Sequence, residues 1–181
     1  MIKELEEGII VVDDFFLDYS DVRKHVTGLS YAGEVNPVDN VLYPYINTDI
    51  PARDEVEYLT DGGFMFLRLS PEGVEAPHQA HNDASMAHNT LLIYLCEGPG
   101  GTSLVRHKET GLYKQPETEE ELAIWQRDYN IYDAWEVTHM FDLVPNRAVS
   151  FPSTLMHRAE PVNGFGKTAE DGRLVLTCFY D

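Results

Sequence analysis

Two tripeptides in the sequence place a carboxylate two residues after a histidine: His81-Asn-Asp83 and His107-Lys-Glu109. On a β-strand, side chains at positions i and i+2 point to the same face, so each tripeptide could present an imidazole and a carboxylate to one metal ion. Two histidines and one carboxylate hold a ferrous ion while leaving positions open for a chelating co-substrate and for dioxygen. So short a pattern also arises by chance in a chain with 7 histidines and 31 acidic residues, and its context must decide.

The surroundings favour the first tripeptide as a metal site. It precedes the strongest apolar strand, residues 90–96, whereas the second tripeptide runs straight into a Thr-Gly turn and is typical of a polar strand end. His157 follows a predicted strand at 147–151, which could deliver it opposite the first tripeptide. His78 and His88 flank that tripeptide and are expected at strand ends or at a pocket rim, and either is an alternative to its own histidine.

Arg173 opens an apolar strand in which Val175, Thr177 and Phe179 share its face by alternation. A guanidinium that points into a core is costly unless it has a partner. A bound dicarboxylate would supply such a partner in bidentate geometry. Pairing with a nearby aspartate, or a surface position at the end of the strand, is the alternative.

The elements that must position these residues are mostly short strands interrupted by glycine and proline. Residues 116–135 differ, because an initial proline, acidic residues and the helical spacing of Leu122, Trp125 and Tyr129 predict one or two inserted helices. We therefore predict one domain over residues 1–181, mainly β, as a β-sandwich or jelly roll with added helices. Strands are expected at 8–16, 64–69, 90–96, 102–107, 147–151 and 173–180, with a helix at 18–26 and an irregular loop at 33–51.

The composition narrows the class of protein. With 13 Lys and Arg against 31 Asp and Glu, the net charge is −18, and the chain lacks the basic patches with which proteins bind nucleic acid. It has no apolar run long enough to span a membrane and no secretion signal, so we expect a cytoplasmic protein. The acidic excess is typical of a solvated surface, and a field that attracts a cationic substrate is the alternative. Cys96 and Cys178 lie in apolar segments and are expected to be buried thiols.

In their order along the chain, these residues resemble the iron(II)/2-oxoglutarate-dependent oxygenase superfamily, nearest in layout to its prolyl-hydroxylase-like branch and to small bacterial and phage members. The resemblance covers nearly the whole chain, and each of its motifs is short. The matching positions are the His-x-Asp motif at His81-Asn-Asp83, the tyrosine of the next strand at Tyr94, the Gly-Gly-x-Thr-like turn at Gly100-Gly-Thr102, the distal histidine at His157, and the carboxylate-binding arginine with its polar neighbour at Arg173 and Thr177.

The resemblance implies a double-stranded β-helix (jelly-roll) dioxygenase in which His81, Asp83 and His157 hold Fe(II). It implies that Arg173, Tyr94 and Thr177 bind 2-oxoglutarate, which is consumed with O2 to give succinate and CO2. Related halogenases replace the carboxylate ligand with glycine or alanine, so the presence of an aspartate implies hydroxylation of a C–H bond. The substrate is expected to be a small molecule or a peptide side chain.

The chain departs from the superfamily in the long segment between His157 and Arg173. If that segment displaces the last strand, Lys167 or Arg158 would bind the carboxylate instead. Residues expected near the substrate are Arg106, His107 and Arg158. The aromatic residues of the insertion are expected to pack on the barrel or to form a lid; they are Trp125, Tyr129, Tyr132 and Trp135.

Two other classes of function remain open from the sequence. A cupin-like metal enzyme, a dioxygenase or isomerase that does not use 2-oxoglutarate, would not need Arg173. A non-catalytic jelly-roll binding module would bind iron weakly and would not turn over 2-oxoglutarate.

Overall fold

The computed structural model describes residues 2–4, 8–35, 42–74 and 79–181. Its helices are α1 (Tyr19–Thr27), α2 (Arg53–Thr60), α3 (Glu119–Asp128) and the short 3-10 helix η2 (Tyr132–Ala134). Its strands are β1 (Ile2–Glu4), β2 (Ile10–Val12), β3 (Ala32–Val35), β4 (Leu42–Asn47), β5 (Phe64–Ser70), β6 (Asn89–Tyr94), β7 (Gly101–His107), β8 (Trp135–Asp142), β9 (Ala148–Pro152), β10 (His157–Glu160) and β11 (Arg173–Tyr180). Within these ranges, no helix is long and apolar enough to cross a membrane.

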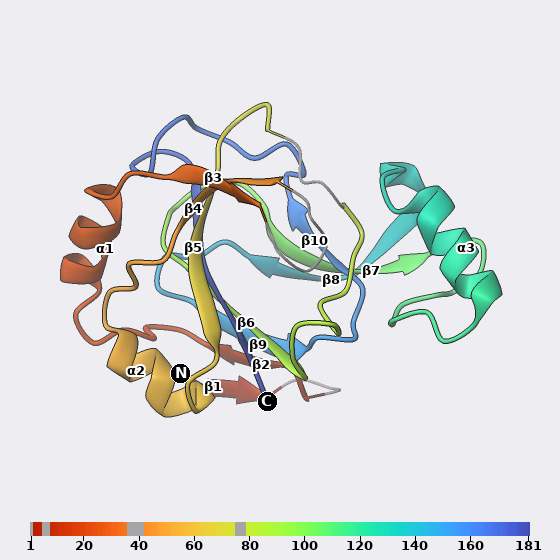
Figure 1. The fold of residues 1–181 in the computed structure, drawn as a ribbon, viewed down its shortest axis with the longest axis horizontal. Helices are drawn as coiled ribbons and strands as arrows, with labels where there is room; N and C mark the ends of the chain where they lie inside the picture. Colours follow the sequence, from red (N-terminus) through yellow and green to blue (C-terminus); the bar gives the residue numbers. More distant parts are fainter. Residues whose placement is uncertain (1, 5–7, 36–41, 75–78) are drawn as a thin grey trace.

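The described strands form two antiparallel sheets that face each other (Figure 1). The large sheet has the order β1-β2-β9-β6-β11-β5-β4-β3, and the small sheet has the order β10-β7-β8. Helices α1 and α2 lie on one side of the large sheet, whereas the small sheet lies on the other side and α3 lies beyond it (Figure 1). This arrangement is a jelly roll with flanking helices, as the sequence predicted.

The alternation of side chains along β11 separates a helix-facing core from the interior between the sheets. Leu174, Leu176 and Cys178 are buried in the main core together with Val26 of α1 and Val56 of α2. The other face carries Arg173, whose Nη2 donates to Gly101 O and to Thr102 Oγ1 of the small sheet. The interior between the two sheets therefore receives the polar face of β11.

The helices predicted at 116–135 form, but the helical segment ends before Trp135. A capping box, in which Thr118 Oγ1 accepts from the backbone N of Glu121 and the Glu121 side chain accepts from the backbone N of Thr118, begins α3. Trp135, predicted at the end of the helical segment, is instead the first residue of β8. A second, small hydrophobic core joins the insertion to the small sheet; it contains Ala80, Val105, Leu112, Trp135 and Met156, with Trp125 and Ala134 packed against it.

The irregular loop predicted at 33–51 is wrong, because β3 and β4 continue the large sheet there. Residues 36–41, between these strands, lie outside the described residues. Within the described ranges, β4 pairs with β5 at Ile46 with Arg68 and at Asn47 with Leu67. Pairing with an existing sheet supplies what a segment rich in Pro, Asn and Asp lacks in local propensity. Helix α2 was not predicted.

Candidate metal centre

Three side chains from two distant parts of the chain meet between the sheets: His81 and Asp83 from one, and His157 from the other. One possible ligand atom from each lies within 4.8 Å of the other two, and no other three-ligand group occurs in the described parts of the chain. His157 Nε2 lies 3.2 Å from Asp83 Oδ2, and His81 Nε2 lies 3.8 Å from Asp83 Oδ1. The imidazole nitrogens and the carboxylate therefore converge on one point.

A backbone bridge brings the two histidines together. His81 N donates to His157 O at 3.0 Å, and His157 N donates to His81 O at 2.8 Å. This isolated antiparallel bridge joins His81 to the first residue of β10, and the two rings lie 4.3 Å apart between centroids. Pairing across the jelly roll thus replaces the continuous strand that the sequence suggested for the tripeptide.

The outer nitrogens of both rings are held by backbone carbonyls. His81 Nδ1 lies 3.1 Å from Gln79 O, and His157 Nδ1 lies 3.0 Å from Leu155 O. Because a carbonyl only accepts, each Nδ1 donates the proton of its hydrogen bond, and each Nε2 is the nitrogen that could bind a metal once it is deprotonated. Hydrogen bonds of this kind orient histidine ligands in metalloproteins.

Asp83 is oriented from the large sheet. Thr90 Oγ1, on β6, donates to Asp83 Oδ2 at 3.2 Å and shares a hydrogen bond of 2.8 Å with Ser153 Oγ. The backbone N of Asp83 also donates to Ser153 O. The carboxylate is therefore fixed by side-chain and backbone contacts on both sides.

The electrostatics of the triad keep its carboxylate ionised. Burial raises the pKa of Asp83, but the charge and hydrogen bond of His157, with a smaller contribution from His81, outweigh burial and lower the pKa of Asp83 to about 2. Burial, and then the neighbouring His157, lower the pKa of His81 to about 4. Burial also lowers the pKa of His157, yet Asp83 outweighs it and the net shift is upward. An anionic carboxylate beside a neutral imidazole is the state that binds a cation.

Arg173 is buried at the other end of the same interior, with 5% of its surface exposed. Its Nη2 donates to Gly101 O at 3.1 Å, whereas its buried Nε has no hydrogen-bond partner within the described residues. Burial lowers the pKa of Arg173. A buried guanidinium N–H without an acceptor is costly, and a ligand carboxylate would satisfy it.

Tyr94 and Thr177 share that interior. Tyr94 is fully buried, and its hydroxyl donates to Phe141 O at 3.4 Å. Burial raises the pKa of Tyr94 to about 12, against the smaller opposing effects of a Thr102 hydrogen bond and the Arg173 charge. Thr177 lies four residues after Arg173 on β11, so the two side chains share one face of the strand. The three residues predicted to bind a co-substrate thus line one interior.

The long segment before Arg173 does not displace the last strand. It folds back on the large sheet, where Phe165 N donates to Ser70 O and Arg173 N donates to Phe165 O. Lys167, the alternative carboxylate ligand, is exposed in this segment.

Arg158, expected near the carboxylate or the substrate, faces away from the triad. It follows His157 on β10 and therefore points to the opposite face of the small sheet. There its Nε donates to Glu160 Oε1 at 2.6 Å, and its guanidinium stacks on the Tyr132 ring at 3.7 Å. Ser103 also donates to Glu160. The ion pair lies within β10, and the contacts of Arg158 with Tyr132, including a bond from Nη1 to Tyr132 O at 3.1 Å, join the insertion to the small sheet.

Arg106 and His107, also expected near the substrate, do not reach the triad. Arg106 is half-exposed and pairs with Glu136 of β8 at 3.6 Å. His107 is buried under the insertion, where its Nε2 lies 3.0 Å from Asp128 Oδ2. Arg106 therefore contacts β8, and His107 contacts the insertion and Trp135 at the start of β8. His88 is exposed and pairs with Asp181, whereas His78 lies outside the described residues.

Two residues on the strand faces that carry Arg173 and His157 were missed in the sequence, and one of them, His139, is exposed. Arg68 of β5 pairs with Val175 of β11 and therefore shares the face of Arg173, and its charge contributes to the lowered pKa of His81. A lone arginine in the alternating stretch 64–70 was a signal that could have found it. His139 of β8 lies across β7 from His157, because both residues pair with Leu104. No sequence pattern marked it.

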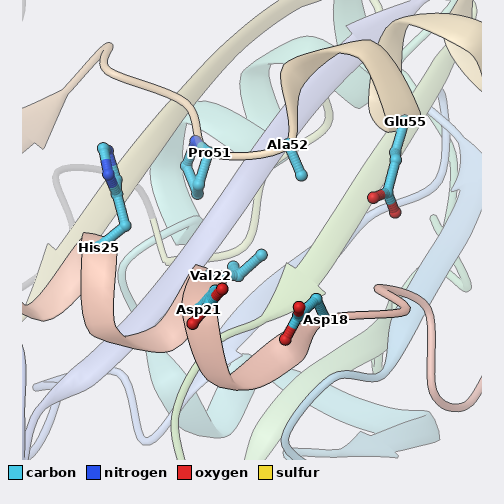
Figure 2. A pocket seen from close by; sticks show the side chains of 7 residues that line it. All are labelled: Asp18, Asp21, Val22, His25, Pro51, Ala52 and Glu55. Carbon is cyan, nitrogen blue, oxygen red and sulfur yellow. The ribbon is translucent and has the colours of Figure 1, made fainter.

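A separate surface pocket lies between α1 and α2, away from the triad (Figure 2). It is on the helix-covered side of the large sheet, and its charged groups are mainly acidic. Its carboxylates do not form a three-ligand group. The residues that line it are Asp18, Asp21, Val22, His25, Pro51, Ala52 and Glu55.

No protein-family model matches the sequence, and no curated protein matches it significantly. Among solved structures, EvdO2 from Micromonospora carbonacea var. aurantiaca in complex with 2-oxoglutarate is similar, with a TM-score of 0.50 and 13% identity over 100% of this chain and 93% of that chain. A second structure of EvdO2 from the same organism gives a TM-score of 0.50 and 14% identity over 98% of this chain and 92% of that one. The chain is a jelly roll. At this level of identity the likeness confirms the fold alone.

Proposed function

We propose that this protein is an Fe(II)- and 2-oxoglutarate-dependent dioxygenase that hydroxylates a C–H bond of a small molecule or a peptide side chain. The observation that carries the proposal is the convergence of His81 Nε2, His157 Nε2 and an Asp83 oxygen on one point between the sheets. Two imidazoles and one carboxylate suit ferrous iron and leave coordination positions open. The 2-oxoglutarate bound to EvdO2, a protein of the same fold, supports the choice of co-substrate.

The interior beyond the triad fits the far carboxylate of 2-oxoglutarate. Arg173 offers a buried Nε–H without an acceptor among the described residues, and Tyr94 lies in the same interior. This unsatisfied donor favours a dicarboxylate over a cupin-like reaction without 2-oxoglutarate, which would leave it unused.

Each residue of the site would have one of two roles, binding the metal or binding the co-substrate. His81, Asp83 and His157 would hold the metal, and Arg173 with Tyr94 and Thr177 would orient the co-substrate. Phe141 and Phe151 stack at 6.4 Å between the sheets, and Phe151 lies 4.9 Å from the His157 ring, so apolar walls exclude water from one side of the site. When bound, iron and 2-oxoglutarate supply the oxidising chemistry with O2, and succinate and CO2 are the coproducts.

The test is anaerobic addition of Fe(II) and 2-oxoglutarate, with the visible charge-transfer band of the chelate as the signal. The wild-type protein is expected to show the band, and His157→Ala is expected to lose it. His88→Ala is the matched control, because His88 is exposed and pairs only with Asp181 among the described residues.

Arg173→Met tests the co-substrate site separately. It removes a charge-assisted bond worth about 1.5–3 kcal/mol, so about 10- to 100-fold more 2-oxoglutarate is expected for the same band. Folded wild-type protein that shows no band would contradict the proposed function. A band that forms at the same 2-oxoglutarate concentration in Arg173→Met as in the wild type would show that Arg173 does not bind the co-substrate.

A further inference from the structure

The backbone just before His81 is held by the insertion. Ala80 N donates to Tyr129 O at 2.9 Å, and Trp125 Nε1 donates to Ala80 O at 2.8 Å. Gln79 N donates to Asn130 Oδ1 at 3.0 Å. Three hydrogen bonds from a short stretch of the insertion therefore reach the two residues that precede the histidine of the triad.

These bonds act on the orientation of the His81 ring. Its Nδ1 donates to Gln79 O, so the acceptor that orients the imidazole belongs to the segment that the insertion holds. Ala80, between them, is fully buried in the small hydrophobic core. Trp125 binds the carbonyl of Ala80, which lies between Gln79 and His81, and limits rotation of the backbone there. The ring position thus depends on the insertion as well as on the bridge to His157.

The insertion is itself fixed to the small sheet, so it can serve as a rigid support. His107 Nε2 lies 3.0 Å from Asp128 Oδ2, and Trp135 Nε1 donates to Asp128 O at 2.9 Å. Both contacts hold the end of α3, one residue before Tyr129. A support that is packed and hydrogen-bonded positions a ligand more accurately than a mobile loop does.

We propose that Trp125 is a positioning residue for His81 and that the insertion sets the affinity and geometry of the metal centre. This role differs from the lid that the aromatic residues of the insertion suggested. The inference rests on the proposed function only in that the triad binds a metal. Loss of an outer hydrogen bond to a ligand typically costs 10- to 100-fold in metal affinity, and Trp125 acts through one further residue, so about a tenfold effect is expected.

The experiment compares Trp125→Phe with Trp135→Phe. Both variants lose one indole N–H donor within the insertion and keep an aromatic ring, but only Trp125 bonds to the segment before His81. The dissociation constant of Co(II) for the metal-free full-length protein is measured by calorimetry, together with the visible absorption of bound Co(II) and the thermal midpoint of each variant.

Trp125→Phe is expected to bind Co(II) about tenfold more weakly and to change the absorption spectrum of the bound ion. Trp135→Phe is expected to lower the thermal midpoint without either change. Equal Co(II) binding by Trp125→Phe and the wild type would overturn the inference, and so would equal weakening in both variants, which would indicate a general loss of stability.

Hydrogen exchange separates this inference from the proposed function. If the wild type bound no Co(II), the proposed function would fail, while exchange at the amides of Ala80 and His81 in the metal-free protein would still report on positioning. Faster exchange there in Trp125→Phe than in Trp135→Phe would support the role of Trp125 in holding His81. Equal rates would overturn it.

Discussion

The two tripeptides of the form His-x-carboxylate lie in different environments, although they have the same spacing. In the first, His81 and Asp83 face each other and meet His157 from β10. In the second, His107 turns into the small core and meets Asp128, whereas Glu109 is exposed and lies 3.5 Å from Arg127. The comparison teaches that a third group from a distant strand, rather than the spacing itself, distinguishes a candidate metal site from a structural pair.

The strongest test of the difference between the two tripeptides is to remove each histidine in turn. His81→Ala is expected to lower Fe(II) affinity by more than about 100-fold, because it removes a metal ligand. Loss of a residue that only hydrogen-bonds to a ligand already costs about 10- to 100-fold. The measurement is the Fe(II) titration of the charge-transfer band with saturating 2-oxoglutarate. His107→Ala should still form the band when folded. Loss of the band in both variants would mean that the second tripeptide also contributes to the centre.

The reverse order is expected for stability. His107→Ala should lower the free energy of unfolding by about 3 kcal/mol, because it opens a cavity beside Trp135 and removes one partner of the buried Asp128. Urea unfolding monitored by tryptophan fluorescence measures this loss. An effect below about 1 kcal/mol would show that the buried pair contributes little to holding the insertion.

The pH dependence of the free energy of unfolding tests the structural role of Asp128, the partner of His107. A hydrogen bond from Arg127 lowers the pKa of Asp128 below its ordinary value of 3.8. Burial acts in the opposite direction, and a hydrogen bond from His107 adds to the lowering. A carboxyl whose folded pKa is depressed stabilises the fold above its unfolded pKa, and this contribution is lost as the pH falls below about 4. Asp128→Asn should therefore lose less stability than the wild type between pH 5 and pH 3 (roughly one unit on each side of that value). Parallel curves from urea unfolding at each pH would contradict the assignment.

The smallest effect is expected for the carboxylate of the second tripeptide. Glu109→Ala removes an exposed ion pair with Arg127, and such pairs contribute about 0–1 kcal/mol. Both the free energy of unfolding and the Fe(II) titration should stay close to those of the wild type. A clear loss of metal binding in this variant would remove the distinction between the two tripeptides.

Strong local patterns made the fold predictable. Short apolar runs bounded by glycine and proline turns located β5, β6, β7, β9 and β11, and helical spacing located α3. The prediction failed where pairing overrides propensity, as in β3 and β4, and where a boundary depends on the next element, as at Trp135. Alternation also explains why Arg158, although next to His157, points away from the triad.

Contacts between distant segments were not readable in the same way. Arg68 shares a face with Arg173, and His139 shares a face with His157, only because β5 pairs with β11 and β8 pairs with β7 in particular registers. Trp125 was expected to pack on the barrel or to cover the site; it packs on the small core, and its indole also donates to Ala80 O, which the sequence did not indicate. A pairing between segments more than forty residues apart leaves no local pattern from which it could be read.

The sequence by itself determined which face of its last strand carries Arg173 and Thr177, because side-chain direction along a strand follows from alternation. Only the tertiary structure decided what that face meets. The bridge between His81 and His157, and the hold of the insertion on Ala80, depend on how two sheets and an inserted helix pack. Packing is a property of the whole chain, and it made one of two identical patterns a candidate metal centre and the other a structural pair.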